Sequence, residues 1–454
     1  MPPKIYKTAR RIGVTGLRGS GKTVFLSSLI NHLMDHDPLL FPIDGRGKAE
    51  IVAFRSLEVP DRHERFNYEG HRDAIVHNGQ WPQKTRDSSL FRCSFGRTDW
   101  RFKTAELELF DFPGERIADA IMAETRDFAK WSRYILAHLE NLSEYRQYAS
   151  EFLDLLEAEA PAEEDLTRAY RLALARLILA YKPLVSPSTF LLGKNGDMPL
   201  ASDPEQIAET RYAGLEPGKQ FTPLSDLAVL KNPELYETFA KRYKEYRKQV
   251  VLPLFNYLRK CHSLVILVDV PTILSAGTSM FDDNLKILED LFTALHPGSS
   301  LMEKIFKGLV FPLPVKWFPG GIARVCFAAS KADMVHPADR DKLLALLRQM
   351  TRKFGQYHEG LKVDYRTVSA VVSTKPVSGE DRLLAGYPIR DRQGKLLSSE
   401  GEMQSFPVSR LPDEWPAGWK PGDYSFVKVY PAIPRRKNRP PEQFGMDRVL
   451  NFLL

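Results

Sequence analysis

The stretch Gly16-Leu17-Arg18-Gly19-Ser20-Gly21-Lys22-Thr23 decides the fold of this chain. It matches the spacing G-x-x-x-x-G-K-[ST], with the apolar segment Ile12 to Thr15 before it and a helical pattern, Val24 to Met34, after it. The three glycines permit positive φ and let successive N–H groups point at phosphate oxygens. The positive end of the following helix dipole adds to that attraction. The stretch therefore predicts a phosphate-binding loop, the alternative being a glycine-rich surface turn.

Within this loop each side chain has an expected role. Lys22 is expected to reach the β- and γ-phosphates, and the Thr23 hydroxyl is expected to bind Mg²⁺. Val24 completes the segment that we expect to contact nucleotide. Arg18 is a candidate for stabilising charge on the transferred phosphate, and a solvent-exposed arginine is the alternative.

A second motif, Asp111-Phe112-Pro113-Gly114, follows an apolar stretch. The segments 89–95 and 101–110 read as two strands of a hairpin that delivers Asp111 at a strand end. The carboxylate can hold Mg²⁺ through water, and the Gly114 amide can bond a γ-phosphate, because glycine allows close approach. A common Asp-x-Pro-Gly turn is the alternative. Glu115 follows as a catalytic candidate, but its charge would be repelled by the γ-phosphate unless it rotates away or is paired with Arg116 or Arg18.

A third motif, Ser330-Lys331-Ala332-Asp333, follows the predicted strand 323–329. In nucleotide-binding folds this pattern reads guanine, because a carboxylate at Asp333 accepts bonds from the N1–H and the exocyclic amine, a donor pair that adenine lacks. The Lys331 stem would lie along the base plane. A helix N-cap is the alternative for this motif.

Two further segments complete the predicted site. Ser369-Ala370-Val371, placed at the end of a strand expected over 367–372, offers a backbone N–H to the guanine carbonyl. Thr85, just ahead of the hairpin, is the expected third Mg²⁺ ligand, with Ser88 and Ser89 as rivals.

Periodicity along the chain predicts an α/β fold: a mostly parallel sheet flanked by helices, with a large all-helical insertion and a small β-rich C-terminal extension. Together with the motifs above, this arrangement is similar to a P-loop NTPase of the G-domain-like type. The helical segments expected in the insertion are 117–139, 143–158, 164–182 and 233–259, with 183–223 read as loop. The expected domains are 1–115 with 262–375 and 435–454 for nucleotide, 116–261 for the insertion, and 376–434 for the extension.

Composition sets broader limits. Over 454 residues the net charge is +7, yet basic residues are interleaved with acids except at 241–248 and 435–439, so we do not expect a nucleic-acid partner. The three cysteines are far apart, which is typical of a reducing compartment. The longest apolar run, 264–274, is too short to span a bilayer. We therefore expect a cytoplasmic protein. His32 and His36, four apart, lack the Cys or acidic neighbours of a metal cluster.

The motif set resembles a TRAFAC-type GTPase domain. The combination of the loop 16–23, Asp-Phe-Pro-Gly-Glu-Arg at 111–116, Trp-Pro-x-Lys-Thr at 81–85 and the helical insertion resembles the YcjX-like P-loop NTPases of bacteria. The resemblance implies GTP binding and hydrolysis to GDP, a role in stress response, and a membrane-linked protein partner that would bring the chain to the inner membrane.

Two departures from the general GTPase pattern accompany this resemblance. Glu115 stands where many such enzymes have glutamine, and Ser330 stands for the usual Asn or Thr. The leading hypothesis is a Mg²⁺-dependent GTPase that switches conformation. The alternatives are an ATPase or P-loop kinase, and a nucleotide-stabilised scaffold with negligible turnover. The residue that orients the attacking water and the oligomeric state are not assigned.

Overall fold

The structure is a computed structural model, and it divides into two compact units. The first comprises Met1–Gly114, Lys260–Asp282 and Val315–Leu454, and the second comprises Glu115–Arg259 and Asp283–Pro314. The described residues are 6–17, 19–61, 63–82, 88–100, 103–159, 161–188, 203–209, 217–295, 321–356, 361–390, 396–398, 401–434 and 439–454.

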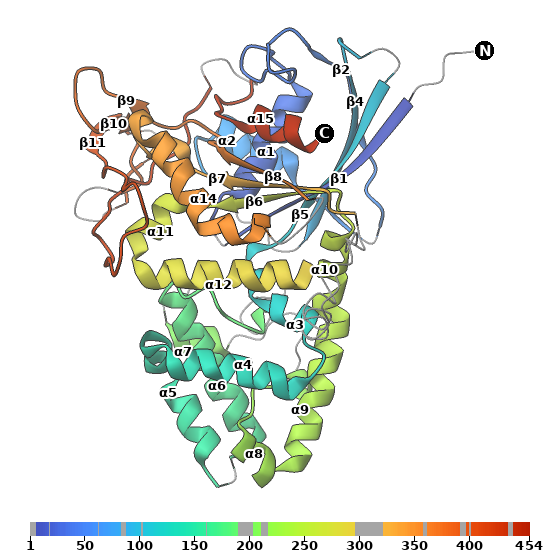
Figure 1. The fold of residues 1–454 in the computed structure, drawn as a ribbon, viewed down its shortest axis with the longest axis vertical. Coiled ribbons are helices and arrows are strands. Elements are labelled where there is room, and N and C mark those ends of the chain that lie inside the picture. Colours follow the sequence, from blue (N-terminus) through green and yellow to red (C-terminus); the bar gives the residue numbers. More distant parts are fainter. Residues whose placement is uncertain are drawn as a thin grey trace, which may run out of the picture. The chain divides into compact units, whose positions relative to one another are not determined.

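An eight-stranded sheet forms the centre of the first unit (Figure 1). Its strands lie in the order β2-β4-β5-β1-β6-β7-β8, and β3 pairs with β4. The strands are β1 (Tyr6–Gly16), β2 (Ile51–Leu57), β3 (Glu64–Arg65), β4 (Ser89–Arg97), β5 (Lys103–Asp111), β6 (Ser263–Val268), β7 (Arg324–Ala329) and β8 (Lys362–Thr367).

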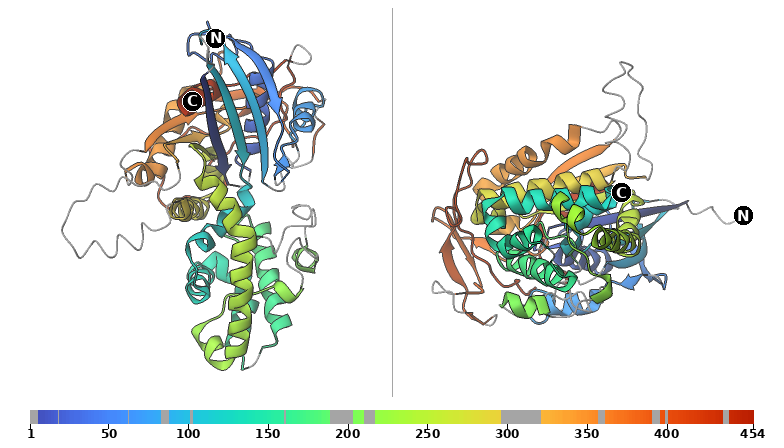
Figure 2. Two further views of the ribbon diagram at one scale, coloured as in Figure 1. Left: turned by 90° about the vertical axis from the view of Figure 1, so that its right-hand side faces the viewer. Right: turned by 90° about the horizontal axis from the view of Figure 1, so that it is seen from below.

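Two kinds of pairing divide this sheet. β4 runs antiparallel to β2 and to β5, so β4 and β5 form a hairpin, whose long blue strands are seen in the left view of Figure 2. From β5 through β1, β6 and β7 to β8 every neighbouring pair is parallel. The carboxyl ends of five strands therefore meet at one edge, which is where open α/β sheets bind their ligands.

Both faces of the central strands are covered, which explains the unbroken apolar run of β6. Successive strand residues point to opposite faces. Leu267 and Cys326 join one core, to which α1 and α15 also contribute. Phe327, on the other face of β7, stacks against Phe354 of α14 with ring centroids 6.4 Å apart.

The helices of the first unit lie between its strands in the sequence and after the last of them. They are α1 (Lys22–Met34), α2 (Tyr68–Val76), α11 (Val270–Ala276), the first residues of α12 (Thr278–Leu295), α14 (Arg340–Gln356) and α15 (Met446–Leu453), with 3₁₀ turns η5 (Ala332–Met334) and η6 (Pro337–Asp339). Both α1 and α15 start after a glycine in the left-handed region, Gly21 and Gly445.

The C-terminal part of the first unit carries a small antiparallel sheet, β9 (Lys375–Pro376), β10 (Leu383–Gly386) and β11 (Gln404–Pro407). Leu384, Phe406, Val408 and Val429 form its core. Two indole nitrogens connect this region to the rest of the unit. Trp81 Nε1 donates to the Val429 carbonyl at 2.7 Å, and Trp419 Nε1 donates to the Leu274 carbonyl at 2.9 Å.

Among its described residues the second unit has helices joined by loops and no strand, and its colours run from cyan to yellow in Figures 1 and 2. Its elements are η1 (Gly114–Asp119), α3 (Ala120–Glu124), α4 (Phe128–Asn141), α5 (Ser143–Glu157), α6 (Glu163–Leu179), α7 (Pro204–Glu209), η3 (Pro217–Lys219), α8 (Asp226–Lys231), α9 (Pro233–Tyr246), the π-helical η4 (Arg247–Val251), α10 (Leu252–Arg259) and the rest of α12. Trp131, Phe221 and Tyr243 form a fully buried aromatic centre, with ring centroids 5.3 Å to 5.8 Å apart.

The predicted fold class is confirmed: the first unit has the mostly parallel, helix-flanked sheet of a P-loop NTPase-like fold, with a helical insertion after β5. The small C-terminal sheet lies where β structure was expected. Among the described helices, none has the length and apolarity to cross a membrane.

Three element predictions are corrected. The helix expected over 117–139 is interrupted, because Asp127 accepts a bond from the Ala129 N–H and caps a new helix, α4. The segment read as loop over 183–223 contains the short helix α7. The last strand covers Lys362–Thr367 and not 367–372. Val368 and Ser369 are buried just beyond β8, and backbone bonds still tie them to Ala329 and Phe444, so an apolar run alone does not show where the strand ends.

The turn into α15 gives a prediction about stability. Gly445 has φ 78°, and a Cβ there would lie 2.3 Å from the Thr367 carbonyl oxygen at the end of β8. We expect Gly445→Ala to lower the free energy of unfolding by more than the roughly 1 kcal/mol that a positive φ costs. Gly418→Ala is the matched control, since Gly418 has φ 63° and no atom near its Cβ position. Equal denaturant midpoints for the two variants would contradict the close contact.

Candidate functional site

The loop between β1 and α1 has the backbone that the sequence predicts. Gly16, Gly19 and Gly21 have φ of 146°, 82° and 88°, values that a side chain would strain. Gly16 is also packed tightly, because a Cβ there would lie 2.4 Å from the Leu267 carbonyl oxygen of β6. Ser20 is buried, and its N–H donates to the Leu17 carbonyl at 3.0 Å.

Lys22 is held at the start of α1. Its Nζ donates to the carbonyls of Gly16 and Leu17 at 2.7 Å and 3.1 Å, and only 9% of the residue is exposed. These two contacts keep the ammonium of Lys22 at the loop, where a phosphate-binding lysine is expected. Thr23 is partly exposed in the first turn of the same helix.

The carboxylate of Asp111 is placed by strand register. Asp111 ends β5 opposite Val14 of β1, two residues before the loop begins, and it is 1% exposed. On the other side Ser89, the first residue of β4, lies opposite Asp111. Hydroxyl and carboxylate oxygens are the donors that Mg²⁺ prefers, so Thr23 and Asp111 fit that ion chemically.

The chain leaves the first unit directly after this carboxylate. Gly114 is buried and is the last residue of that unit, while Glu115 is partly exposed and begins the second. Arg116, which was expected as a partner for Glu115, is 9% exposed and its charge acts on Asp119 of the second unit.

The Ser330 to Asp333 motif follows β7 at the same edge of the sheet as the loop. Ser330 donates its N–H to the Val268 carbonyl at 2.9 Å, which ties the motif to the end of β6. Lys331 has φ 57°, in the left-handed region, and the next N–H, of Ala332, donates to the Val368 carbonyl at 3.0 Å.

Asp333 is buried but well supplied with donors. Its Oδ1 accepts from Ser369 Oγ at 2.5 Å, and its Oδ2 accepts from the Ser373 N–H at 3.0 Å. Burial raises the pKa of the Asp333 carboxyl, while these two hydrogen bonds and the charge of Arg340 act in the opposite direction. The carboxylate has further lone pairs, so these contacts orient it without exhausting its capacity.

The segment Ser369-Ala370-Val371 lies beside this carboxylate, in the loop after β8. Ser28 of α1 donates its hydroxyl to the Ala370 carbonyl at 2.6 Å. Val371 packs with Val24 and Trp81, so the residue that follows the phosphate loop touches the segment predicted to read the base. Ser369 exchanges two backbone bonds of 2.9 Å with Phe444.

Three residues that the sequence interpretation did not select belong to this site. Asp269, directly after β6, pairs with Lys331 at 2.5 Å. Arg340 lies 4.5 Å from the ring centre of Phe444. A signal existed for Asp269, a carboxylate ending an apolar strand. The other two are placed by a contact between residues 104 positions apart, which no local pattern reveals.

Two of the predicted site residues, Arg18 and Thr85, lie outside the described residues, so their roles stay predictions. His32, which the sequence did not favour as a metal ligand, is placed by the structure. His32 is fully buried and stacks on Phe41 with centroids 4.9 Å apart, and burial lowers its pKa to about 3. His32 therefore contributes to the packing of buried residues beside α1.

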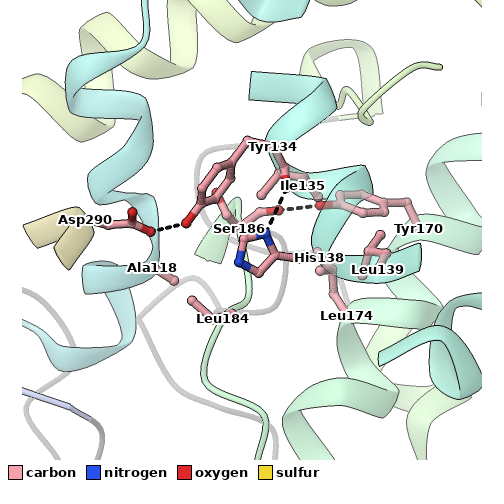
Figure 3. A pocket seen from close by; sticks show the side chains of 10 residues that line it. All are labelled: Ala118, Tyr134, Ile135, His138, Leu139, Tyr170, Leu174, Leu184, Ser186 and Asp290. Carbon is pink, nitrogen blue, oxygen red and sulfur yellow. Dashed lines mark hydrogen bonds between the residues drawn. The ribbon is translucent and has the colours of Figure 1, made fainter. Parts of the chain in front are cut away.

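The second unit has a small pocket of its own (Figure 3). Tyr134 donates its hydroxyl to Asp290, Tyr170 donates to the Ser186 carbonyl, and His138 Nδ1 lies 2.9 Å from the Tyr134 carbonyl oxygen. The cavity holds only about 10 Å³, which is the room needed by a single water molecule. It is too small for a nucleotide.

The sheet topology, the glycine loop and the helical insertion define a protein with a P-loop NTPase-like α/β fold. The chain belongs to the YcjX-like family, DUF463, whose family model matches residues 10–454. It is 26% identical over 486 residues to "Ras-like GTPase YcjX" of Escherichia coli (strain K12), covering 98% of this chain and 95% of that protein. It is 24% identical over 494 residues to "Ras-like GTPase YcjX" of Shewanella oneidensis, covering 99% and 94%.

The bonds to Asp333 give a prediction about pH. Ser369→Ala removes a donor to a buried carboxylate, so we expect a loss of about 1.5–3 kcal/mol in unfolding free energy, against about 1 kcal/mol for Ser28→Ala, which removes a bond to a neutral carbonyl. Burial has raised the native pKa of Asp333, and the variant raises it further. The unfolding free energy lost in Ser369→Ala should therefore grow as pH rises through this pKa and shrink below it. Urea midpoints measured across pH give this loss, and a loss independent of pH would contradict a bond from Ser369 to the Asp333 carboxylate.

Proposed function

We propose that this chain is a Mg²⁺-dependent GTPase whose nucleotide state sets the conformation of its helical unit. The observation that carries the proposal is the placement of Lys22 after β1 and Asp333 after β7, at the carboxyl ends of two parallel strands that are separated only by β6 in one sheet. A phosphate-binding group and a buried, oriented carboxylate at one edge fit the two ends of a nucleotide.

The base end favours guanine on chemical grounds. An ionised carboxylate only accepts hydrogen bonds, and guanine offers two adjacent donors, its N1–H and its amine. Adenine has an acceptor at N1, so it would repel the same carboxylate. The bonds from Ser369 and Ser373 orient Asp333 toward the loop that carries Ala370.

The phosphate end fits triphosphate hydrolysis. The loop amides and Lys22 would hold the β- and γ-phosphates, and Thr23 and Asp111 would hold Mg²⁺, with Thr85 the predicted third ligand. When bound, Mg²⁺ neutralises phosphate charge. The Gly114 N–H would bond the γ-phosphate while water attacks in line. Arg18 is the candidate for added positive charge. Glu115 is the weakest member of this set, because its carboxylate repels the same phosphate.

Competition binding tests the base preference. We expect GTP to displace a labelled guanine nucleotide at least tenfold more effectively than ATP, because each unpaired polar group in a buried site costs about 1–3 kcal/mol. Asp333→Asn should reverse the preference toward XTP, since xanthine has a carbonyl oxygen where guanine has the amine. Equal binding of ATP and GTP, unaffected by Asp333→Asn, would indicate the alternative, an ATPase or P-loop kinase in which Ser330 to Asp333 is only a cap.

Phosphate release separates an enzyme from a nucleotide-stabilised scaffold. We expect Mg²⁺-dependent release that Lys22→Ala abolishes, because the variant lacks the cation at the phosphates. If release is absent or does not depend on Lys22, even with candidate partners added, the chain acts as a scaffold.

The proposed coupling to the helical unit starts from chain connectivity. Residues 115–125 follow Gly114 without interruption, and α9, η4 and α10 hold them from one side. Tyr243 donates its hydroxyl to the Thr125 carbonyl at 2.6 Å. Arg247 donates to the carbonyls of Met122 and Ala123 at 2.6 Å and 2.9 Å. A shift of Gly114 would therefore move residues 115–125, and through these hydrogen bonds it would act on α9 and η4.

Asp119 forms a further, fully buried connection in this region. Its carboxylate accepts from the Tyr246 hydroxyl at 2.8 Å, from the Ser186 hydroxyl at 3.1 Å, and from the N–H and hydroxyl of Ser188 at 3.0 Å and 2.8 Å. Burial raises its pKa, against the pull of these bonds and of Arg116. Through this carboxylate η1 is bonded to Tyr246 at the end of α9 and to the segment that carries Ser186 and Ser188, so a shift of η1 would be passed to both. The π-helical turn η4, next to Tyr246, is a place where this helix can change register.

Hydrogen exchange tests this coupling. We expect GTP and GDP to give different protection over 233–259 in the wild type, and Tyr246→Phe to reduce that difference by half or more, because it removes one bond to Asp119. Tyr145→Phe is the control, since Tyr145, in the same unit, donates its hydroxyl to the buried Asp283 at 3.0 Å and not to Asp119. An unchanged difference in Tyr246→Phe, or the same reduction in Tyr145→Phe, would exclude coupling through Asp119.

The remaining parts of the proposal come from the family resemblance. They are a role in stress response and a membrane-associated protein partner that would bring a cytoplasmic protein to the inner membrane. The exposed Lys241, Lys244 and Lys248 give α9 and η4 a basic outer surface that fits an acidic partner.

A further inference from the structure

The ion pair between Lys331 and Asp269 is the basis of an inference that rests on the proposed function. Lys331 Nζ lies 2.5 Å from Asp269 Oδ2. The two residues follow neighbouring parallel strands, β7 and β6, so the lysine side chain reaches across from one strand end to the next.

Asp269 is itself held in place. Its Oδ1 accepts the Thr272 N–H at 3.1 Å, and its Oδ2 accepts the Thr272 hydroxyl at 2.7 Å. It is 9% exposed and caps α11. β6 lies between β7 and β1, and Leu267 pairs with Gly16, the first residue of the phosphate loop. Asp269 therefore stands between the phosphate end and the base end of the site.

Both the backbone and the ammonium group of Lys331 are held in place. Its backbone is in the left-handed region, and the bonds from the N–H groups of Ser330 and Ala332 hold that turn to Val268 and Val368. The ammonium is held by Asp269, while the side chain stays 31% exposed. The exposed part is consistent with an apolar stem that is open on one side.

A ligand that packs on a lysine side chain already fixed in this way causes a smaller loss of side-chain entropy than a ligand that packs on a free one. Ordering a lysine side chain costs about 2 kcal/mol of rotamer entropy, and the ion pair has met that cost before a ligand arrives. Lysine methylenes cover apolar surface while the charged end stays with polar partners.

We propose that Asp269 is a positioning residue for the nucleotide base: it holds Lys331 so that the lysine stem forms the surface on which a purine ring packs. This contact is with the face of the ring and not with its edge groups. Asp269 therefore sets affinity for purine nucleotides in general, whereas Asp333 sets the choice between purines.

Asp269→Asn is the informative variant, because asparagine caps a helix as well as aspartate and only the charge is lost. We expect its Kd to rise about tenfold for GDP and by the same factor for IDP, which lacks the amine, so that the ratio of the two stays at the wild-type value. Lys331→Met keeps an apolar stem without the charge. If Asp269 acts through the ammonium, adding Asp269→Asn to Lys331→Met should produce little further loss.

Asp413→Asn is the matched control, since Asp413 pairs with Lys342 at 2.9 Å and Lys342 is also 31% exposed. It should leave Kd unchanged, and melting temperatures of all variants show whether they are folded. The inference is overturned if Asp269→Asn binds like the wild type, if its effect adds fully to that of Lys331→Met, or if it changes the GDP to IDP ratio. Failure of the proposed function is a separate result, seen when the wild type binds ADP as well as GDP, and the Asp269 comparison can then be made with ADP.

Discussion

The parallel pairing of β1 with β5 on one side and β6 on the other is the constraint on which the rest of the structure depends. Its register places Val14 opposite Asp111 and Gly16 opposite Leu267. The glycine loop, the Asp111 carboxylate and the end of β6 are brought to one edge by backbone hydrogen bonds alone. The tight contact of Gly16 with the Leu267 carbonyl shows how little the loop can shift against its neighbour.

Three buried carboxylates have different roles, two of them at this edge of the sheet and the third in the helical unit. Asp333 is oriented by a hydroxyl and an N–H from the loop after β8, Asp269 holds a lysine, and Asp119 gathers four donors inside the helical unit. Each is costly to bury without partners. Their partners lie far away in sequence, so each carboxylate also fixes the position of a distant segment.

Much of this could be predicted from sequence, because the signals are local. The strand, glycines and helix at 12–34 specify the loop, and the hairpin spacing specifies Asp111. The errors have physical causes: Asp127 restarts a helix within an otherwise continuous apolar period, and β8 ends at Thr367 although Val368, Ser369 and Val371 beyond it are also buried. Asp269 and Arg340 were missed because their roles come from contacts across the sheet and with Phe444.

The discontinuity of the first unit has a consequence for synthesis. β1 needs β6 as a neighbour, but residues 112–262, which include the larger segment of the helical unit, are made between β5 and β6. During translation β1, β4 and β5 must wait with one edge of β1 uncovered, and such an edge can pair with other chains. The insertion thus sets a period in which a growing chain is exposed to aggregation, and chaperones would act most usefully before β6 emerges.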